Sequence, residues 1–406
     1  VPLPANALAG GRLGGLVLYA AAPWVLGQLA RAGGIAPFGS RGGVHGPAVI
    51  ARPFVFRCLS LGLLLAVLAI PVPAVLGLAI AIAAVWCVAG ILTGQVKGLG
   101  ALLATAIGAT VVAFVLHLPW SLSLLSWSET TMTGPVLPPT SSAGRAFGFG
   151  EILRFETGPF GSSPLTWALL PASSLGLLIG KSWRFGWAAR GWLLALASWG
   201  AVVAVQQRWV SVYLPENEVL LAPGAAGLAL AAAMGVAAFE VDLNDYQIGW
   251  RQPASFLTVA ALLVGLVPPF ATLVDGRFGM PEGDYQRPLS NLAADTDAPS
   301  RVLWIGDSSV LPMNGYAADI RGLNSAGDGR ALAYATSDGA NPSVENLWPG
   351  TETAGIRQLT DALSSAGGGG SRLGELLAPM GIRYIVVVER LAPGRFANEV
   401  AVDQPR

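Results

Sequence analysis

The chain has 406 residues, of which 53% are hydrophobic and only 12% are charged, and its mean hydropathy is +0.57. A soluble domain carries about 25% charged residues, and a nucleic-acid binder needs a basic excess, whereas here 24 Lys and Arg balance 24 Asp and Glu. The composition therefore excludes a soluble enzyme, a disordered chain and a nucleic-acid-binding protein, and predicts an integral membrane protein whose first partner is the lipid bilayer.

The charged residues are unevenly distributed, and this predicts the domain organisation. Residues 1–274 hold 21 charged side chains, whereas residues 275–406 hold 27 in less than half that length, with a net charge of −5. We expect a transmembrane helical domain over 1–274, a linker over 275–300 that is rich in Pro, Asp, Gly and Ser, and a small extracytoplasmic α/β domain over 301–406. The chain begins without an initiator Met or a basic leader, so we treat it as a fragment of a longer protein.

Apolar segments in the first domain predict a polytopic α-helical membrane protein of about eight transmembrane helices, because each crossing needs about 17–25 apolar residues. None of these segments holds an ionised side chain in its middle, which argues against a transporter. The predicted spans are Leu13–Leu29, Phe54–Ile70, Ala74–Leu92, Leu99–Leu118, Leu165–Ile179, Trp192–Val205, Leu221–Phe239 and Phe256–Leu273.

Basic residues predict the orientation of these helices. Loops 30–53 and 180–191 each contain Lys or Arg but no acid, and Lys97 stands alone in the short loop between them. The positive-inside rule makes these loops cytoplasmic. Alternation then places loops 119–164 and 206–220, and everything after Val274, outside the cytoplasm of a bacterium, in a multi-pass protein of the plasma membrane. Loop 240–252 would also be cytoplasmic but is acidic, so it does not fit this charge pattern; acids, however, contribute little to orientation.

The long loop 119–164 is the predicted location of any chemistry, since long loops without structure are often functional. A carboxylate at the outer membrane face can act as a base on a sugar hydroxyl, and an arginine can hold a lipid phosphate. The alternative is an interfacial segment with solvated charges, and the spacing selects no single acid. The candidate catalytic acids are Glu129, Glu151 and Glu156, and the candidate substrate-binding residues are His117, Trp120 and Arg154.

The second domain shows alternating strand and helix patterns. Residues 301–305 and 331–335 are predicted strands, and residues 353–363 and 371–380 are predicted helices. The run Ile382–Val388 contains five β-branched residues, so we predict a central strand buried on both faces. These patterns predict a small α/β domain.

The segment Val302–Ser308 resembles the nucleophile block of GDSL-type hydrolases, in which Ser308 would be the nucleophile. Such a serine needs a His as base, and no His follows His117 in the chain. We therefore interpret Asp307 and Ser308 as a turn after a strand. The domain also lacks Cys and His clusters, so no metal site is predicted.

The run Leu376–Val387 resembles the LGVRYVVV signature in the extracytoplasmic tails of large actinobacterial membrane glycosyltransferases. These include arabinofuranosyltransferase-like (C-type) proteins and multidomain proteins that carry a cytoplasmic family-2 glycosyltransferase domain. The stretch Phe239–Leu243 with Gly249–Gln252, and the run Asn346–Gly350, are also similar to the latter group. The resemblance covers most of 160–395. It implies that the nucleotide-sugar domain, with its divalent-metal motifs, lies upstream of Val1, so it transfers no catalytic residue and no cofactor to this fragment.

Three functions follow as hypotheses. The first is the C-terminal membrane portion of a bacterial glycosyltransferase of cell-envelope polysaccharide synthesis, which transfers sugar from a nucleotide- or polyprenyl-phosphate-linked donor. Its expected partners are the polyprenyl-phosphate sugar and the envelope glycan. The second is a non-catalytic membrane scaffold whose outer domain binds glycan or a partner protein. The third is an exporter of lipid-linked sugar.

Overall fold

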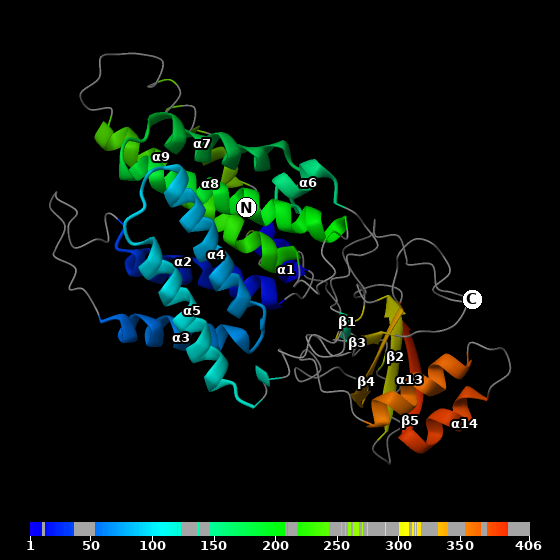
Figure 1. Ribbon diagram of the computed structural model, residues 1–406. Helices are drawn as coiled ribbons and strands as arrows, with labels where there is room; N and C mark the ends of the chain where they lie inside the picture. The colour runs from blue at the N-terminus through cyan, green and yellow to red at the C-terminus, as the bar shows by residue number, and fades with distance from the viewer. Residues whose placement is uncertain are drawn as a thin grey trace. The chain divides into compact units, whose positions relative to one another are not determined.

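The computed structural model forms two compact units (Figure 1). Unit 1 comprises Val1–Ser121 and Phe147–Phe278, and unit 2 comprises Leu122–Ala146 and Gly279–Arg406. Part of the loop between the fourth and fifth predicted spans thus groups with the C-terminal unit. The structure describes residues 1–9, 13–35, 53–119, 121–122, 136–137, 147–158, 160–207, 209, 217–242, 300–307, 315–317, 332–339, 354–366 and 372–388, with scattered positions between 253 and 274 and at 289, 311 and 313.

A helix lies over each of the first seven predicted spans, as expected of a helical membrane protein. Of these, α2, α4, α5, α8 and α9 are long and apolar enough to cross a membrane, while α3 and the pair η3–α7 are shorter. Most of the eighth span lies outside the described residues. The helices of unit 1 are α1 (Leu3–Ala9), α2 (Leu13–Gly33), α3 (Phe54–Ala69), α4 (Val75–Leu92), α5 (Leu99–Leu116), α6 (Phe149–Leu153), η3 (Pro164–Ala168), α7 (Leu169–Ile179), α8 (Trp183–Gln206) and α9 (Asn217–Asp242).

Helices α8 and α9 pack backbone against backbone at two glycines. A Cβ atom added at Gly227 of α9 would lie 2.6 Å from the carbonyl oxygen of Gly191 in α8, and a Cβ at Gly191 would collide with the carbonyl of Gly227. Helix α7 approaches α9 in the same way, because a Cβ at Gly176 would lie 2.6 Å from the oxygen of Ala231. Small residues at helix contacts allow this close approach. The resulting van der Waals contacts stabilise helix association in lipid, where the hydrophobic effect contributes little.

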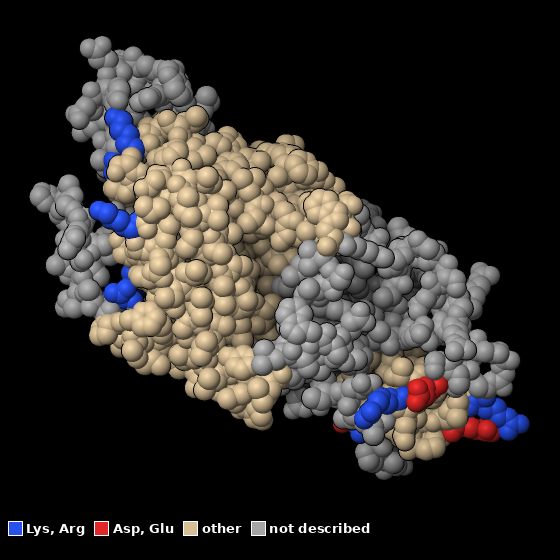
Figure 2. Space-filling view, in the orientation of Figure 1, with Lys and Arg blue, Asp and Glu red and all other residues tan. Residues whose placement is uncertain are grey.

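Two hydrogen bonds connect helix ends at one end of unit 1. Arg57 at the start of α3 donates to the carbonyl of Ala32 at the end of α2, at 3.1 Å. Gln95, in the turn between α4 and α5, donates to the carbonyl of Ser182 just before α8, at 3.2 Å. Lys and Arg side chains gather at this end of the helical unit in the space-filling view (Figure 2). We call it the basic end, and its described basic residues include Arg31, Arg57, Lys97, Lys181 and Arg184.

Unit 2 contains a five-stranded sheet in the order β1-β3-β4-β2-β5. Strand β5 pairs parallel to β2, and the other pairs are antiparallel. The parallel pair needs a crossover, which contains α13 (Ala354–Ala366), α14 (Leu373–Leu377) and η5 (Ala378–Met380). The strands are β1 (Val136–Leu137), β2 (Arg301–Asp307), β3 (Gly315–Ala317), β4 (Leu332–Asp338) and β5 (Ile382–Val388).

The two faces of the sheet bury different clusters around β2. On one face Leu303 and Tyr334 pack against Leu359 and Leu363 of α13 and Leu377 of α14 (Figure 1). On the other face Val302 and Trp304 pack with Leu311, Met313 and Val388, and the Trp304 indole donates to the Ser337 hydroxyl at 2.8 Å. The central apolar strand of this domain is therefore β2.

The prediction that Ile382–Val388 is a central strand is wrong. Among the described strands β5 lies at the end of the order, next to β2 alone. Ile382 and Val388 are buried, but Ile385 is 45% and Val387 is 52% exposed. An apolar run indicates that a strand can be buried on both faces. The position of the strand in the sheet, however, depends on which distant segments pair with it, and the run does not encode this.

The glycine contact between α8 and α9 generates the first prediction. Replacing Gly191 by Leu should separate the two backbones and lower the free energy of unfolding by about 1–3 kcal/mol, as overpacking does. The matched control is Gly200→Leu, because a Cβ at Gly200 of the same helix meets no atom within 4 Å. Thermal unfolding of the detergent-solubilised chain, followed by helical circular dichroism, measures both. Equal midpoints for the two variants would contradict this packing.

Candidate functional site

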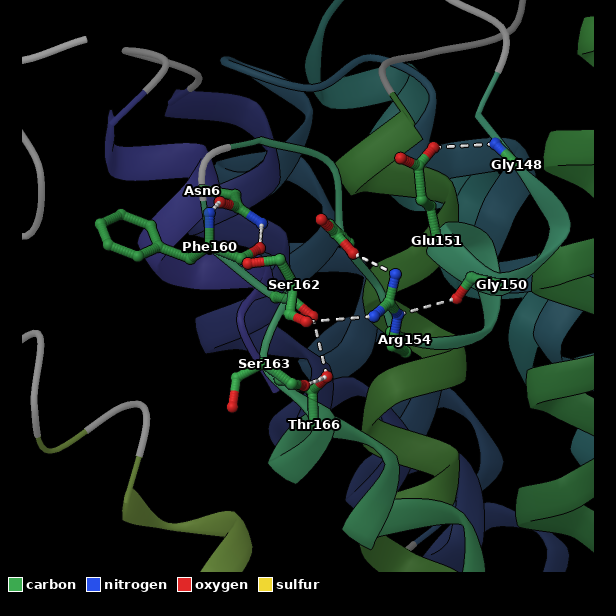
Figure 3. Close-up of polar contacts among 11 residues, drawn as sticks. Asn6, Gly148, Gly150, Glu151, Arg154, Phe160, Ser162, Ser163 and Thr166 are labelled. Atoms are coloured by element: carbon green, nitrogen blue, oxygen red, sulfur yellow. Dashed lines mark hydrogen bonds and ion pairs between the residues drawn. The ribbon is translucent and has the colours of Figure 1, made fainter. Parts of the chain in front are cut away.

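Three of the predicted site residues lie in α6 or directly after it: Glu151 within the helix, and Arg154 and Glu156 in the segment that follows (Figure 3). Arg154 and Glu156 form an ion pair with 2.7 Å between Nη2 and Oε2, and their side chains are only 18% and 14% exposed. The same guanidinium donates from Nε to the carbonyl of Gly150 at 3.2 Å, and from Nη1 to the carbonyl of Ser162 at 3.3 Å. It also lies 5.5 Å from the ring centre of Trp167. Arg154 therefore holds together the segment between α6 and η3.

Glu151 caps the short helix α6. Its Oε2 accepts from the backbone N–H of Gly148 at 2.8 Å, and an acid in the first turn also suits the positive end of a helix. After α6 the chain reverses at Phe155, which has the left-handed φ of 58°. The Phe155 ring is buried and packs 5.7 Å from the ring of Trp199 in α8. This burial offsets the backbone cost of the turn, which directs Glu156 back toward Arg154.

A second anchor comes from Asn6 in α1. Its side-chain amide accepts from the Phe160 N–H and donates to the Phe160 carbonyl, both at 2.8 Å. Asn6 is 2% exposed, and a Cβ at Gly158 would lie 2.9 Å from its Oδ1. Gly161 has a φ of 124°, and a Cβ there would lie 2.9 Å from Cβ of Glu156. The two glycines let the loop close over α1 and the ion pair.

The remaining candidates do not join this segment in the described part of the chain. His117 ends α5, and its Nε2 lies 2.8 Å from the carbonyl oxygen of Ala66 in α3, where it ties two helices together. Trp120 and Glu129 lie outside the described residues, as does Ser308. The structure therefore brings Glu151, Arg154 and Glu156 close in space and assigns His117 to a helix contact.

The chemistry open to this arrangement is limited by its bonds. Glu156 forms an ion pair with a guanidinium, Glu151 accepts from a backbone N–H, and Arg154 donates to two carbonyls. The expectation of solvated charges is wrong for Arg154 and Glu156, which are mostly buried. Among the described residues no group of three or more His, Cys, Asp and Glu is arranged to hold a metal ion. The geometry supports a rigid connection between helices.

The sequence analysis missed two buried ionisable residues. Arg190 was assigned to loop 180–191, but α8 begins at Trp183 rather than Trp192, and Arg190 is fully buried within it. It donates to Gln95 Oε1 at 2.8 Å and lies 5.4 Å from the Trp187 ring centre. The prediction that residues 180–191 form a loop is therefore wrong from Trp183 onward, because these residues belong to α8. The sequence did contain a signal for the earlier start of α8, because Trp183 and Trp187 extend the helical spacing of apolar residues one turn at a time toward Lys181.

Glu218 is the second missed residue. It lies in the first turn of α9, was assigned to loop 206–220, and is fully buried. A Cβ at Gly15 of α2 would lie 2.5 Å from Cβ of Glu218. Glu218 therefore packs between α2 and α9, at a position where the charge pattern of the sequence indicated a solvated loop.

Comparisons with known proteins give no match: no family model, no curated protein and no solved structure is similar to this chain. The class that the fold defines is that of a mostly helical protein, with five described helices long and apolar enough to cross a membrane, and a small sheet-containing unit.

The ion pair between Arg154 and Glu156 generates the second prediction. Arg154→Met should leave the Glu156 carboxylate without its ion-pair partner and two carbonyls without their donor, and should lower the free energy of unfolding by about 1–3 kcal/mol. The double variant Arg154→Met, Glu156→Gln should recover part of the loss, since the unpaired charge is removed. Thermal midpoints in detergent measure both variants. Lys97→Met, at an exposed turn, is the control, and an equal effect in that variant would show that Arg154 has no special role.

Proposed function

We propose that the chain is the C-terminal membrane part of a bacterial glycosyltransferase of cell-envelope polysaccharide synthesis, and that it serves the enzyme as a membrane platform. The sugar donor would be nucleotide- or polyprenyl-phosphate-linked. The catalytic acid or base would come from outside the segment between α6 and η3. The resemblance of Leu376–Val387 to glycosyltransferase tails is the reason for proposing this enzyme class. The contacts that Glu151 and Glu156 already make are the observation that supports a platform role.

The bonds of the candidate acids support a platform over a catalytic loop. A general base must come within hydrogen-bond reach of the proton that it abstracts. Glu156 already contacts Arg154 at 2.7 Å and is 14% exposed, so approach of a sugar hydroxyl would first require the ion pair to open. Glu151 would have to release the N–H of Gly148. Both acids instead stabilise the connection that holds α1, α6 and α7 in place.

Two observations support an extracytoplasmic location for unit 2. The basic end of unit 1 joins the end of α2, the start of α3, the turn between α4 and α5, and the start of α8, and the positive-inside rule assigns such an end to the cytoplasm. The loop after α5 starts at the opposite end of the bundle, and its strand β1 pairs with β3.

This strand pairing also supports an even number of crossings between β1 and β3, since two strands of one sheet share one compartment. Segments η3–α7, α8 and α9 would supply three crossings. The predicted span Phe256–Leu273 would supply the fourth. The eight-span topology therefore agrees with the pairing of Val136–Leu137 and Gly315–Ala317.

The two alternatives differ in their support. A non-catalytic scaffold uses the same rigid connections and differs from the platform only in the absence of sugar transfer. An exporter requires a polar path through the bundle. A pocket that the described helices enclose is lined by apolar residues of α2, α4 and α9, including Leu26, Ile82 and Pro223. The buried Arg190 of α8 and Glu218 of α9, two ionisable residues within apolar helices, favour transport.

Sugar transfer by the full-length protein is the third prediction. In vesicles, it should transfer label from one of a panel of nucleotide sugars or polyprenyl-phosphate sugars. Glu151→Gln and Glu156→Gln should each keep most of the turnover per folded molecule, whereas removal of a general base costs about 100-fold or more. Transfer from none of the donors would favour the scaffold. A 100-fold loss in Glu156→Gln with unchanged folding would make Glu156 catalytic and overturn the platform role.

The fourth prediction concerns topology. With Cys58 and Cys87 replaced, a Cys at Ser371 should react with a membrane-impermeant maleimide in intact cells, because that residue follows α13 in unit 2. A Cys at Ser182, at the basic end, should react only after the membrane is opened. The reverse pattern would place unit 2 in the cytoplasm.

A further inference from the structure

Two arginines of unit 1 differ in how their donor groups are used. Arg154 has a partner at each of its three nitrogens: Nε and Nη1 donate to backbone carbonyls, and Nη2 forms the ion pair with Glu156. Arg190 is fully buried, and its Nη1 donates to Oε1 of Gln95 at 2.8 Å. Among the described residues, its Nε and Nη2 have no hydrogen-bond partner. These two nitrogens lie on one edge of the guanidinium plane and together form an unused fork of donors.

The unused fork of Arg190 carries a charge that is costly to bury. A guanidinium stays protonated in proteins, and ionisable groups within apolar helices are rare and mark functional sites. The ring of Trp187, whose centre lies 5.4 Å from the guanidinium carbon, and the amide of Gln95 are both neutral, so they compensate the charge only in part. A fork of buried donors is the arrangement that binds a carboxylate or phosphate through two parallel hydrogen bonds.

The start of α8 adds a second positive group beside Arg190. Helical side chains tilt toward the N-terminus of their helix, and Gln95, which accepts from Arg190, also donates to the carbonyl of Ser182 directly before α8, at 3.2 Å. The first turn of this 24-residue helix holds no acid, and the side chain of Ser182 does not cap it. A helix N-terminus attracts anions, and phosphate above all. The positive end of α8 and the guanidinium therefore meet at one side chain, Gln95.

Gln95 covers the guanidinium from the basic end. It lies in the short turn between α4 and α5, between Gly94 and Gly98, whose φ values of 70° and 85° are both left-handed. Its amide lies directly against the backbone of Gly186 in α8, where a Cβ atom would collide with it. The side chain is half-buried, and its amide makes one hydrogen bond on each side. Gln95 is thus a neutral cover, and by turning aside it admits an anion to Arg190.

We propose that the basic end contains a phosphate-binding site in which phosphate oxygens accept from Nε and Nη2 of Arg190 once Gln95 turns aside. The planar fork of a guanidinium suits this two-point contact. The basic residues of the same end, among them Lys97, Lys181 and Arg184, raise the local concentration of anions. The phosphate belongs to a lipid headgroup of the adjoining leaflet or comes free from the water, and both present the same oxygens. The site does not depend on the proposed sugar transfer.

The fifth prediction is phosphate binding that depends on Arg190. The full chain in detergent is equilibrated with labelled inorganic phosphate at constant ionic strength and, separately, with phosphatidic acid, whose bound copies are counted by native mass spectrometry. Arg190→Gln should weaken binding of whichever probe binds by about tenfold to hundredfold, because charge-assisted hydrogen bonds are lost. Arg154→Met is the matched control, since that arginine already has a partner at each nitrogen, and it should leave the affinity unchanged.

Removal of the cover tests the same site in the opposite direction. Gln95→Ala should strengthen binding by about threefold or more, because the neutral amide no longer competes for Arg190. A damaged fold does not raise affinity, so this variant keeps the test decisive even when Arg190→Gln fails to fold. Arg190→Lys, which keeps the charge but loses the planar fork, should bind more weakly than the unaltered chain and more tightly than Arg190→Gln. Helical circular dichroism shows which variants fold.

The two probes distinguish the sources of the phosphate. Saturable binding of inorganic phosphate assigns the site to a free phosphate, and binding of phosphatidic acid alone assigns it to a lipid headgroup. The proposal is overturned by saturable binding of neither probe, by equal affinity of the unaltered chain and a folded Arg190→Gln variant, or by weaker binding in a folded Gln95→Ala variant. Sugar transfer is measured separately on the full-length protein, so the failure of either proposal leaves the other standing.

Discussion

The helical unit depends on the close approach of backbones at small residues. Within hydrocarbon the backbone must satisfy its own hydrogen bonds, so each apolar segment is helical. Apolar side chains gain little by leaving lipid for another helix. Association therefore requires dense packing, and Gly191 and Gly227 provide it where α8 meets α9. Gly176 does the same for α7. These contacts bring three helices together and thereby place their ends, where the polar groups of the unit are found.

Polar contacts then act at both ends of the bundle. At the basic end, Gln95 links the turn between α4 and α5 to Ser182 and to the buried Arg190. At the opposite end, Arg154 and Asn6 hold the segment between α6 and η3 against α1. Such contacts contribute little to stability when they are exposed to water. Their contribution is larger where the surroundings exclude water. The candidate acids are part of this framework, which is why the geometry favours a platform over a reactive loop.

Unit 2 is stabilised differently, because the hydrophobic effect favours burial of its apolar side chains. Leu303, Trp304 and Tyr334 are removed from solvent between α13 and the loop residues on the other face of the sheet. Strand β2 is central because both of its neighbours bury its side chains. Strand β5 contributes its even positions to the same core and leaves its odd positions exposed.

The sequence alone determined the membrane class, the approximate place of seven helices, and the helices and three longer strands of unit 2, because hydrophobic length and periodicity are local properties; it did not predict the short strands β1 and β3. It also identified the Arg154 and Glu156 region as charged, without indicating that the two side chains pair. Tertiary structure decided the rest. Arg190 and Glu218 are buried because neighbouring helices enclose them, although their charges indicated loops. Among the described strands, β5 lies at the end of the sheet because it pairs with β2 alone. Partner choice between distant segments depends on the free energy of packing, which no local pattern encodes.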